Sequence, residues 1–537
     1  MPALPHLVPR PASMTVTGPG GWHLTPTTPL RLEPGLEPVA ELLRELLDQP
    51  LPRATADTPG ALTLRTEPAL APEAYRIEVT PAGATVTAAG PGGHRIAAQT
   101  LRQLLDEGRP DGRGGVSVPC VDIADAPRFG WRGLLIDVAR HFFPIEFLHK
   151  LVDLAALHRL NVLHLHLTDD QGWRMEIEKY PRLTEVGAWR AETLVGRYTF
   201  QDDPDAVFDG TPHGGYYTKA ELRALVAHAA SRGITVVPEI DLPGHMRAAI
   251  AAYPELGNDL EPARPVCTTW GITEQILNVE ESTLQFCRDV LTEVLEVFPG
   301  PYVHLGGDEV PKREWRQSPR VQQRMRELGL PSESALAAWF TRQLAEFLTA
   351  RGRRPIGWDE LLEDGLPAGT TLMSWRDEEG GAQAARLGHD VVMTPHQLLY
   401  FTVYQADPDR VEQPLAVAEV LTTADVYAYR PVPPGLPPNA AAHILGAQGC
   451  LWTELMPTAR QVEYMAFPRL CALAEVLWGT AGDYPEFAFR LTKHLRRLTR
   501  LNVTPGPLPP TRPAVATGPG RPCPCQGSVG QQISCVG

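Results

Sequence analysis

The sequence predicts an α/β protein in which a (β/α)8 TIM barrel follows a small α+β domain. Beyond residue 127, eight short apolar segments alternate with polar loops and amphipathic helical patterns, as parallel strands joined by helices do. The 537 residues exceed one domain, and such a barrel alone takes about 250 residues. We therefore expect the α+β domain over 1–126, the barrel over 127–504 and a tail over 505–537.

The first domain combines strand and helix patterns. Segments 61–64, 75–79 and 84–87 are rich in strand-forming residues, and 37–47 and 94–106 have apolar residues at helical spacing. Because no cluster of reactive side chains occurs there, we expect this domain to support the barrel structurally.

The barrel elements follow in order along the chain. The predicted strands are short and apolar, and they cover residues 133–138, 162–167, 235–240, 302–305, 355–358, 371–375, 390–393 and 444–448. The clearest helices between or after them cover residues 145–160, 219–232, 281–297, 333–350 and 459–477.

Residues 505–537 are rich in proline, glycine, glutamine and serine and contain too little apolar material to fold alone, so we expect a disordered tail. Cys523, Cys525 and Cys535 lie in it, at spacings that do not match a metal site. The other cysteines are scattered singly, as small buried hydrophobes are.

Charge and hydropathy exclude two classes of partner. The net charge is −14, from 63 acids and 49 bases, and no long basic run could follow a phosphate backbone, so we expect no nucleic acid partner. No stretch of about 20 apolar residues occurs, and prolines interrupt the start where a secretory signal needs an apolar run. We expect a cytoplasmic protein without membrane contact; the sequence does not predict the oligomeric state.

The end of the fourth predicted strand carries two adjacent acids, Asp308 and Glu309. Gly306 and Gly307 let the backbone bend before them, so the two carboxyl groups need not point to opposite faces. In a dry cleft one carboxyl of such a pair stays protonated while the other stays charged. The pair could then donate a proton and stabilise a cation, although an isolated Asp-Glu pair is more often structural.

Other polar and aromatic residues also follow predicted strands. In a parallel barrel, residues just past the strands form the active face. Arg140 follows the first strand, while Trp358, Trp375 and Trp452 follow the fifth, sixth and eighth. Aromatic rings that cover the C–H faces of a pyranose, together with carboxylates and an arginine for its hydroxyls, indicate a sugar site.

Six motifs occur in order at these strand ends: GLLIDVARHFFP (133–144), NVLHLHLTDDQGWR (161–174), PEIDLPGH (238–245), HLGGDE (304–309), GWDE (357–360) and LWTE (451–454). On these motifs the chain resembles the family-20 glycoside hydrolases, the β-N-acetylhexosaminidases. The resemblance covers roughly residues 128–502 and extends weakly into the first domain through 98–105.

The resemblance implies a retaining, exo-acting hydrolase of terminal N-acetylglucosamine or N-acetylgalactosamine, with oligosaccharides or glycoconjugates as substrates and no cofactor. In this family the substrate's own 2-acetamido group attacks the anomeric carbon. Glu309 would be the acid and later the base, and Asp308 would accept the amide N–H and stabilise the oxazolinium-like intermediate.

The resemblance also assigns supporting roles. Tyr400 would donate to the amide carbonyl, and Arg140 and Glu454 would bind the C3 and C4 hydroxyls. Asp169 and His245 would form a hydrogen-bonded chain to Glu309. The same resemblance gives the walls around the acetamide and the sugar face as Trp358, Trp375 and Trp452.

Some assignments stay open. Asp169 is preferred to Asp170 from the family pattern only, and Asp241 could either support the loop or act behind the site. His164 and His166 could suggest a metal, but this chemistry needs none, so we expect no metal. The family commonly has Asp or Asn where this chain has Thr402, which puts recognition of the sugar's C6 hydroxyl in doubt.

Three rival functions follow from the same residues. A specialised relative could release disaccharides or trim chitin oligomers. A barrel isomerase or lyase could bind a divalent metal through the strand-end acids. A non-catalytic sugar-binding protein is disfavoured because Asp308 and Glu309 are both present.

Overall fold

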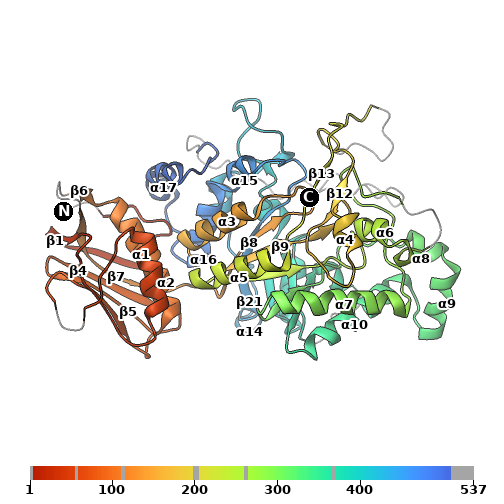
Figure 1. Ribbon diagram of the computed structural model, residues 1–537, viewed down its shortest axis with the longest axis horizontal. Coiled ribbons are helices and arrows are strands. Elements are labelled where there is room, and N and C mark those ends of the chain that lie inside the picture. The colour runs from red at the N-terminus through yellow and green to blue at the C-terminus, as the bar shows by residue number, and fades with distance from the viewer. Residues whose placement is uncertain are drawn as a thin grey trace.

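The computed structural model describes residues 4–54, 58–110, 115–197, 205–258, 264–363, 365, 367 and 369–508. The chain forms two parts that lie side by side, an N-terminal sheet with two helices and a larger barrel surrounded by helices (Figure 1). The predicted disordered tail lies outside the described residues from 509 onward, and so do its three cysteines.

The larger part is a closed barrel of eight parallel strands, as predicted from the apolar segments. In barrel order the strands are β8 (Trp131–Asp137), β9 (Val162–His166), β14 (Thr235–Glu239), β15 (Tyr302–His304), β16 (Arg354–Trp358), β17 (Thr371–Ser374), β18 (Val391–Met393) and β21 (Ile444–Leu451). Each predicted strand overlaps one of these strands. They read as continuous apolar runs because the barrel interior covers one face and helices cover the other.

Four predicted helices are confirmed as α3 (Ile145–Leu157), α5 (Lys219–Arg232), α7 (Glu281–Val297) and α10 (Glu333–Thr349). The helix predicted over 459–477 is two helices, α15 (Ala459–Ala466) and α16 (Arg469–Trp478). The break falls at Phe467, which is extended (ψ 137°) because the ring of the following Pro468 disfavours a helical conformation before it.

The remaining helices of the barrel part are α4 (Arg182–Glu185), α6 (Arg247–Ala252), α8 (Arg313–Gln317), α9 (Pro319–Leu328), α11 (Glu378–Arg386), α12 (His396–Leu399), α13 (Thr423–Ala428), α14 (Pro438–Ala441) and α17 (Tyr484–Arg500), with short 3-10 turns at Pro254–Leu256 and Asp359–Leu362. In the described part of the chain, the loops contain three short strand pairs: β10 (Thr168–Asp169) with β11 (Gly172–Trp173), β12 (Trp189–Arg190) with β13 (His213–Gly214), and β19 (Val403–Tyr404) with β20 (Val417–Val420).

The N-terminal part is a mixed sheet with strand order β1-β7-β4-β5-β3-β2, and β6 pairs with β7. Its strands are β1 (Ser13–Leu24), β2 (Leu30–Leu32), β3 (Leu62–Thr66), β4 (Tyr75–Thr80), β5 (Gly83–Ala88), β6 (Arg109–Pro110) and β7 (Val116–Asp125). Helices α1 (Glu37–Leu47) and α2 (Pro91–Asp106) lie between this sheet and the barrel helices α5 and α3 (Figure 1). Helix α2 begins earlier than predicted because Pro91 is suited to the first turn of a helix.

A buried ion pair joins the two parts. Asp125, at the end of β7, accepts hydrogen bonds from Arg159 (2.8 Å), the Trp478 indole (2.8 Å) and the Tyr75 hydroxyl (2.6 Å). The guanidinium of Arg159 also lies 4.8 Å from the Trp478 ring centroid. Because Asp125 and Arg159 are both fully buried, each compensates for the lost hydration of the other.

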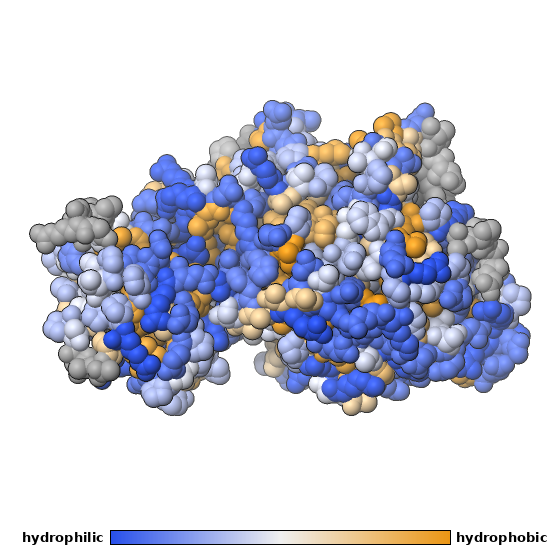
Figure 2. Space-filling view, in the orientation of Figure 1, coloured by the Kyte–Doolittle hydropathy of each residue, from blue (hydrophilic) through white to orange (hydrophobic). Residues whose placement is uncertain are grey.

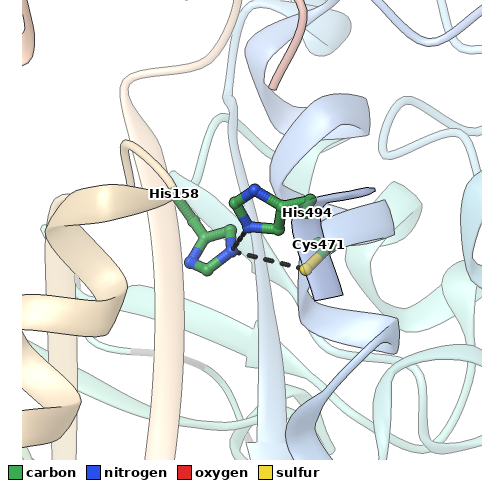
Figure 3. A group of neighbouring side chains, drawn as sticks. All are labelled: His158, Cys471 and His494. Atoms are coloured by element: carbon green, nitrogen blue, oxygen red, sulfur yellow. Dashed lines mark hydrogen bonds between the residues drawn. The ribbon is translucent and has the colours of Figure 1, made fainter. Parts of the chain in front are cut away.

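A second buried polar cluster ties α3 to α16 and α17 (Figure 3). The Nε2 atoms of His158 and His494 lie 2.8 Å apart, and the Cys471 Sγ lies 3.3 Å from His158 Nε2. His158 Nδ1 donates to the Leu154 carbonyl, so its Nε2 is an acceptor. Arg497 donates to His494 Nδ1, which leaves the His494 proton on Nε2. A chain of hydrogen bonds therefore satisfies these groups.

The surface is mostly hydrophilic on the face drawn in Figure 2, where hydrophobic residues (orange) occur in small groups. Among the described residues, no helix is both long and apolar enough to cross a membrane. Cys120, Cys267, Cys287, Cys450 and Cys471 are buried and form no disulfide, as predicted.

Replacement of Asp125 by alanine should destabilise the protein strongly. The change leaves the buried Arg159 guanidinium without its counterion, a loss that costs about 3–5 kcal/mol. Chemical denaturation would measure it, with Asp122→Ala on the exposed face of the same strand as the matched control. Equal stability of the two variants would show that the buried pair does not hold the two parts together.

Candidate active site

The two adjacent acids lie on a tight turn that begins directly after β15. Gly306 (φ 66°), Gly307 (φ 95°) and Glu309 (φ 48°) all have positive φ, so the chain does not continue as a strand. A side chain at Gly306 would lie 1.8 Å from the Asp241 Oδ1, and that same oxygen accepts a hydrogen bond from Gly307 N (3.1 Å). Asp241 therefore supports the turn, and the glycines are required there.

The turn brings both acids to the wall of one cavity at the carboxyl ends of the barrel strands. Eight of the ten residues predicted for the site line it: Arg140, His245, Asp308, Glu309, Trp375, Tyr400, Trp452 and Glu454. The other two, Asp169 and Trp358, lie behind this wall and are almost fully buried. Gly271 and Ile272 complete the lining.

Asp169 connects two lining residues from behind the wall. Its carboxylate lies 2.8 Å from the Arg140 Nη2 and 3.3 Å from the His245 Nδ1. It also accepts from His166 (2.8 Å). Burial would favour the neutral acid, but Arg140 and His245 hold the pKa of Asp169 well below its usual range. Asp170 also approaches His245 (3.4 Å), so both acids of the motif contact the same imidazole.

His245 lies between Asp169 and the two strand-end acids. Its Nε2 is 3.6 Å from the Glu309 Oε2 and 3.9 Å from the Asp308 Oδ2. Burial opposes a positive charge, but the Asp169 carboxylate holds the pKa of His245 well above its usual range. An imidazolium therefore lies beside both acids and can stabilise either carboxylate.

Glu239 organises the floor below the cavity. It accepts from the Trp358 indole (2.9 Å) and from His166 (2.6 Å), and its Oε1 lies 3.0 Å from the His304 Nδ1. Burial opposes its ionisation, but His304 and His166 hold the pKa of Glu239 well below its usual range. Trp358 is thus fixed as part of the floor, and its ring centroid lies 5.9 Å from that of Trp452.

Three aromatic rings form one side of the cavity. Trp375 and Tyr400 are stacked, with centroids 6.2 Å apart and ring planes 11° apart. Tyr400 and Trp452 centroids are 5.9 Å apart, and the Arg140 guanidinium lies 5.1 Å from the Trp452 ring. The Trp375 indole donates to Glu360 (3.0 Å), which fixes the outer ring.

Burial shifts the pKa values of the groups that face the cavity. It raises the pKa of Asp308, and the nearby His245 only partly offsets the rise. It raises the pKa of Tyr400 well above the usual range, so the hydroxyl keeps its proton. It also raises the pKa of Glu454 to about 7, although Arg140 favours the charged form.

Several polar atoms at the cavity are buried without a hydrogen-bond partner in the described part of the chain. On the residues that line it they are Asp308 Oδ1, the Arg140 Nε and Nη1, both ring nitrogens of His245 and the Trp452 Nε1. Buried polar groups are rarely left unpaired in a folded protein, so those that face the cavity mark places where ligand groups would bind.

Buried acids and imidazoles come close enough to hold an ion in several places. The groups at this end of the barrel are His164–Glu239–His304, His166–Glu239–Asp241, Asp169–Asp170–His245 and Asp241–His245–Asp308. Glu239 and Asp169 already accept several hydrogen bonds or ion pairs, as described above. The absence of a metal stays a prediction.

Sequence reasoning gave no role to some residues of the site. Glu239 and Glu360 follow or end strands and were visible as motif residues, but their contacts with Trp358 and Trp375 depend on side-chain direction. Gly271 and Ile272 come from a long loop without any motif, and no sequence signal indicates that this loop reaches the cavity.

Comparison with known proteins agrees with this geometry. The family profile for the catalytic domain of glycosyl hydrolase family 20 matches residues 129–481, and the profile for domain 2 of the same family matches residues 4–126. The chain is 39% identical over 483 residues to a Beta-hexosaminidase of Porphyromonas gingivalis, covering 86% of this chain and 59% of that protein. It is 38% identical over 420 residues to a Beta-hexosaminidase of Vibrio furnissii, covering 77% of this chain and 66% of that protein.

Among solved structures, the fold is similar to the GH20 exo beta-N-acetylglucosaminidase from Vibrio harveyi in complex with N-acetylglucosamine. The TM-score is 0.82 at 32% identity, over 94% of this chain and 79% of that one. The two family matches cover the barrel and the small domain that precedes it. The chain therefore belongs to glycosyl hydrolase family 20.

Proposed function

We propose that this protein is an exo-acting, retaining β-N-acetylhexosaminidase that removes terminal N-acetylglucosamine or N-acetylgalactosamine from oligosaccharides or glycoconjugates. One observation carries the proposal. Two adjacent acids face a cavity beside three aromatic rings, and a buried oxygen of Asp308 has no partner among the described residues. A substrate amide N–H would satisfy that oxygen. The names of the family relatives support the same substrate class.

The first chemical step breaks the glycosidic bond. Glu309 gives its proton to the leaving oxygen while the carbonyl oxygen of the substrate's acetamide attacks the anomeric carbon. The products of this step are the free alcohol and a cyclic oxazolinium ion, so no protein nucleophile is consumed. The His245 imidazolium, 3.6 Å from Glu309, stabilises the carboxylate that remains.

Asp308 and Tyr400 hold the acetamide for this attack. The Asp308 carboxylate accepts the amide N–H, and the positive charge of the intermediate favours its ionised form, which burial alone disfavours. The protonated Tyr400 hydroxyl donates to the amide carbonyl oxygen and aligns it with the anomeric carbon. The rings of Trp375 and Trp452 exclude water from the intermediate.

The second step restores the enzyme. The Glu309 carboxylate takes a proton from water, the water oxygen attacks the anomeric carbon, and the oxazolinium ring opens to the acetamide. Two inversions at the same carbon give retention. Arg140 and Glu454 also line the cavity and would bind the C3 and C4 hydroxyls, which favours cleavage at a chain terminus.

The acetamide should be essential for turnover. We expect an aryl N-acetyl-β-glucosaminide to be hydrolysed at least about 10³-fold faster than the matching β-glucoside, because only the former carries the internal nucleophile. Release of the aryl alcohol measures both rates. Equal rates on the two substrates would contradict the proposed mechanism, and unchanged rates after treatment with EDTA would argue against a metal-dependent rival.

Replacement of Glu309 by glutamine should have a leaving-group-dependent effect. Loss of the general acid should lower kcat on a chitin disaccharide by about 10²–10⁴-fold, but much less on an aryl glycoside whose leaving group needs little protonation. Glu379→Gln, on the exposed surface, is the matched control. Identical losses on the two substrates would mean that Glu309 is not the acid.

For Asp308→Asn we expect a selective loss of turnover. The amide cannot stabilise the developing positive charge, so kcat should fall by about 10²–10³-fold while KM changes little. Steady-state kinetics with an aryl N-acetyl-β-glucosaminide separates the two constants. A raised KM with normal kcat would assign Asp308 to ground-state binding instead.

A further inference from the structure

A second cavity adjoins the catalytic one and shares two of its lining residues, Trp452 and Glu454. We propose that this second cavity binds an uncharged acyl group carried on the C6 position of the terminal amino sugar. The proposal rests on the proposed function, because it uses the orientation of the sugar in the catalytic cavity.

The walls of the second cavity come from six separate places along the chain. Thr402 precedes β19, and Leu415, Val417 and Ala418 lie at β20, which pairs with β19. Met456 follows β21 and Met465 belongs to α15, and both are almost fully buried. The lining is mainly aliphatic and methionine-rich, which favours an apolar occupant of adaptable shape.

Hydrogen bonds hold the loop at Gly196 and Arg197 against this cavity. Arg197 donates from Nε to the Ala416 carbonyl (2.8 Å) and from Nη2 to the Tyr404 hydroxyl (3.0 Å). The Trp270 indole donates to the Gly196 carbonyl (3.2 Å). The loop before residue 198 is therefore fastened to the β19–β20 pair, and the cavity is a built feature of the fold.

The position of the cavity determines which part of the sugar reaches it. In the proposed mechanism the anomeric carbon lies at Asp308 and Glu309 and the C4 hydroxyl at Glu454, so the far end of the ring would lie toward Glu454, which lines both cavities. Glu454 would bind the C4 hydroxyl directly, so C6, the exocyclic carbon of the ring, is the branch that can extend past Trp452 and Glu454. Thr402 lines this second cavity and offers a hydroxyl where the family commonly has Asp or Asn.

The charges at the cavity favour a neutral substituent over sulfate or phosphate. An anion there would lie beside the Glu454 carboxyl and among aliphatic side chains that cannot solvate it. Arg197 is the cation of the lining, and two of its nitrogens already donate to the protein. An acyl group places its carbonyl near Arg197 or Thr402 and its alkyl chain against the methionines.

The test compares an aryl N-acetyl-β-glucosaminide with its 6-butanamido-6-deoxy and 6-sulfo derivatives. The amide is used because it does not hydrolyse or migrate. We expect the wild-type protein to accept the 6-butanamido compound with a kcat/KM within about threefold of that for the unsubstituted compound. We also expect it to prefer the 6-butanamido compound to the matching 6-acetamido compound by about threefold in kcat/KM per added methylene. The sulfate should be at least about tenfold slower than the butanamide, because its charge would be desolvated.

The Ala418→Trp variant would fill the cavity from an exposed residue of its lining. Leu387→Trp, at an exposed residue outside both cavities, is the matched control. Overpacking should lower kcat/KM for the butanamide by about tenfold or more, with little effect on the unsubstituted substrate. An equal loss on both substrates, or rejection of the butanamide by the wild type, would overturn the acyl site while leaving the hydrolase function intact. If no aryl substrate is turned over, the proposed function fails. Calorimetry of the free 6-butanamido sugar with the wild type and with Ala418→Trp still decides whether the second cavity binds this sugar.

Discussion

The buried carboxylate of Asp169 is the constraint on which the rest of the site depends. It lies where three loops of the barrel meet, and it contacts Arg140, His166 and His245. An ionised acid at 1% exposure is tolerated only because these partners compensate for its lost hydration. Since the same partners face the cavity or its floor, the requirement to neutralise one buried charge also fixes the positions of Arg140 and of the imidazolium beside Glu309.

Such buried charge is poor evidence for stability, because well-packed apolar residues often serve as well. Its value here is geometric. Glu239 repeats the arrangement in the floor, where its contacts with His166, His304 and Trp358 link the ends of neighbouring strands. This network leaves several buried atoms without a partner among the described residues. One of them, Asp308 Oδ1, belongs to a residue that lines the cavity, where the proposed substrate would supply the missing partner.

Much of this could be predicted from the sequence because strand ends in a parallel barrel converge by rule. The eight strands, the turn at Gly306 and most of the cavity lining followed from apolar segments and the residues after them. Where side-chain direction decides, sequence was insufficient: Trp358 faces Glu239 in the floor, and Asp169 and Asp170 both reach His245. The second cavity could not be predicted, since its walls lie on six separate parts of the chain that only loop packing brings together.

Asp308 and Glu309 are adjacent in the sequence for a physical reason. An enzyme without its own nucleophile must hold a flexible substrate amide as rigidly as a side chain would be held. The two acids lie on one glycine-dependent turn that Asp241 supports, and His245 lies between them and Asp169. Tyr400, stacked on a Trp375 that Glu360 holds, is supported in the same way at the aromatic side of the cavity. The catalytic demand is therefore met by rigid supports behind the site, so changes that loosen those supports should harm turnover before they harm binding.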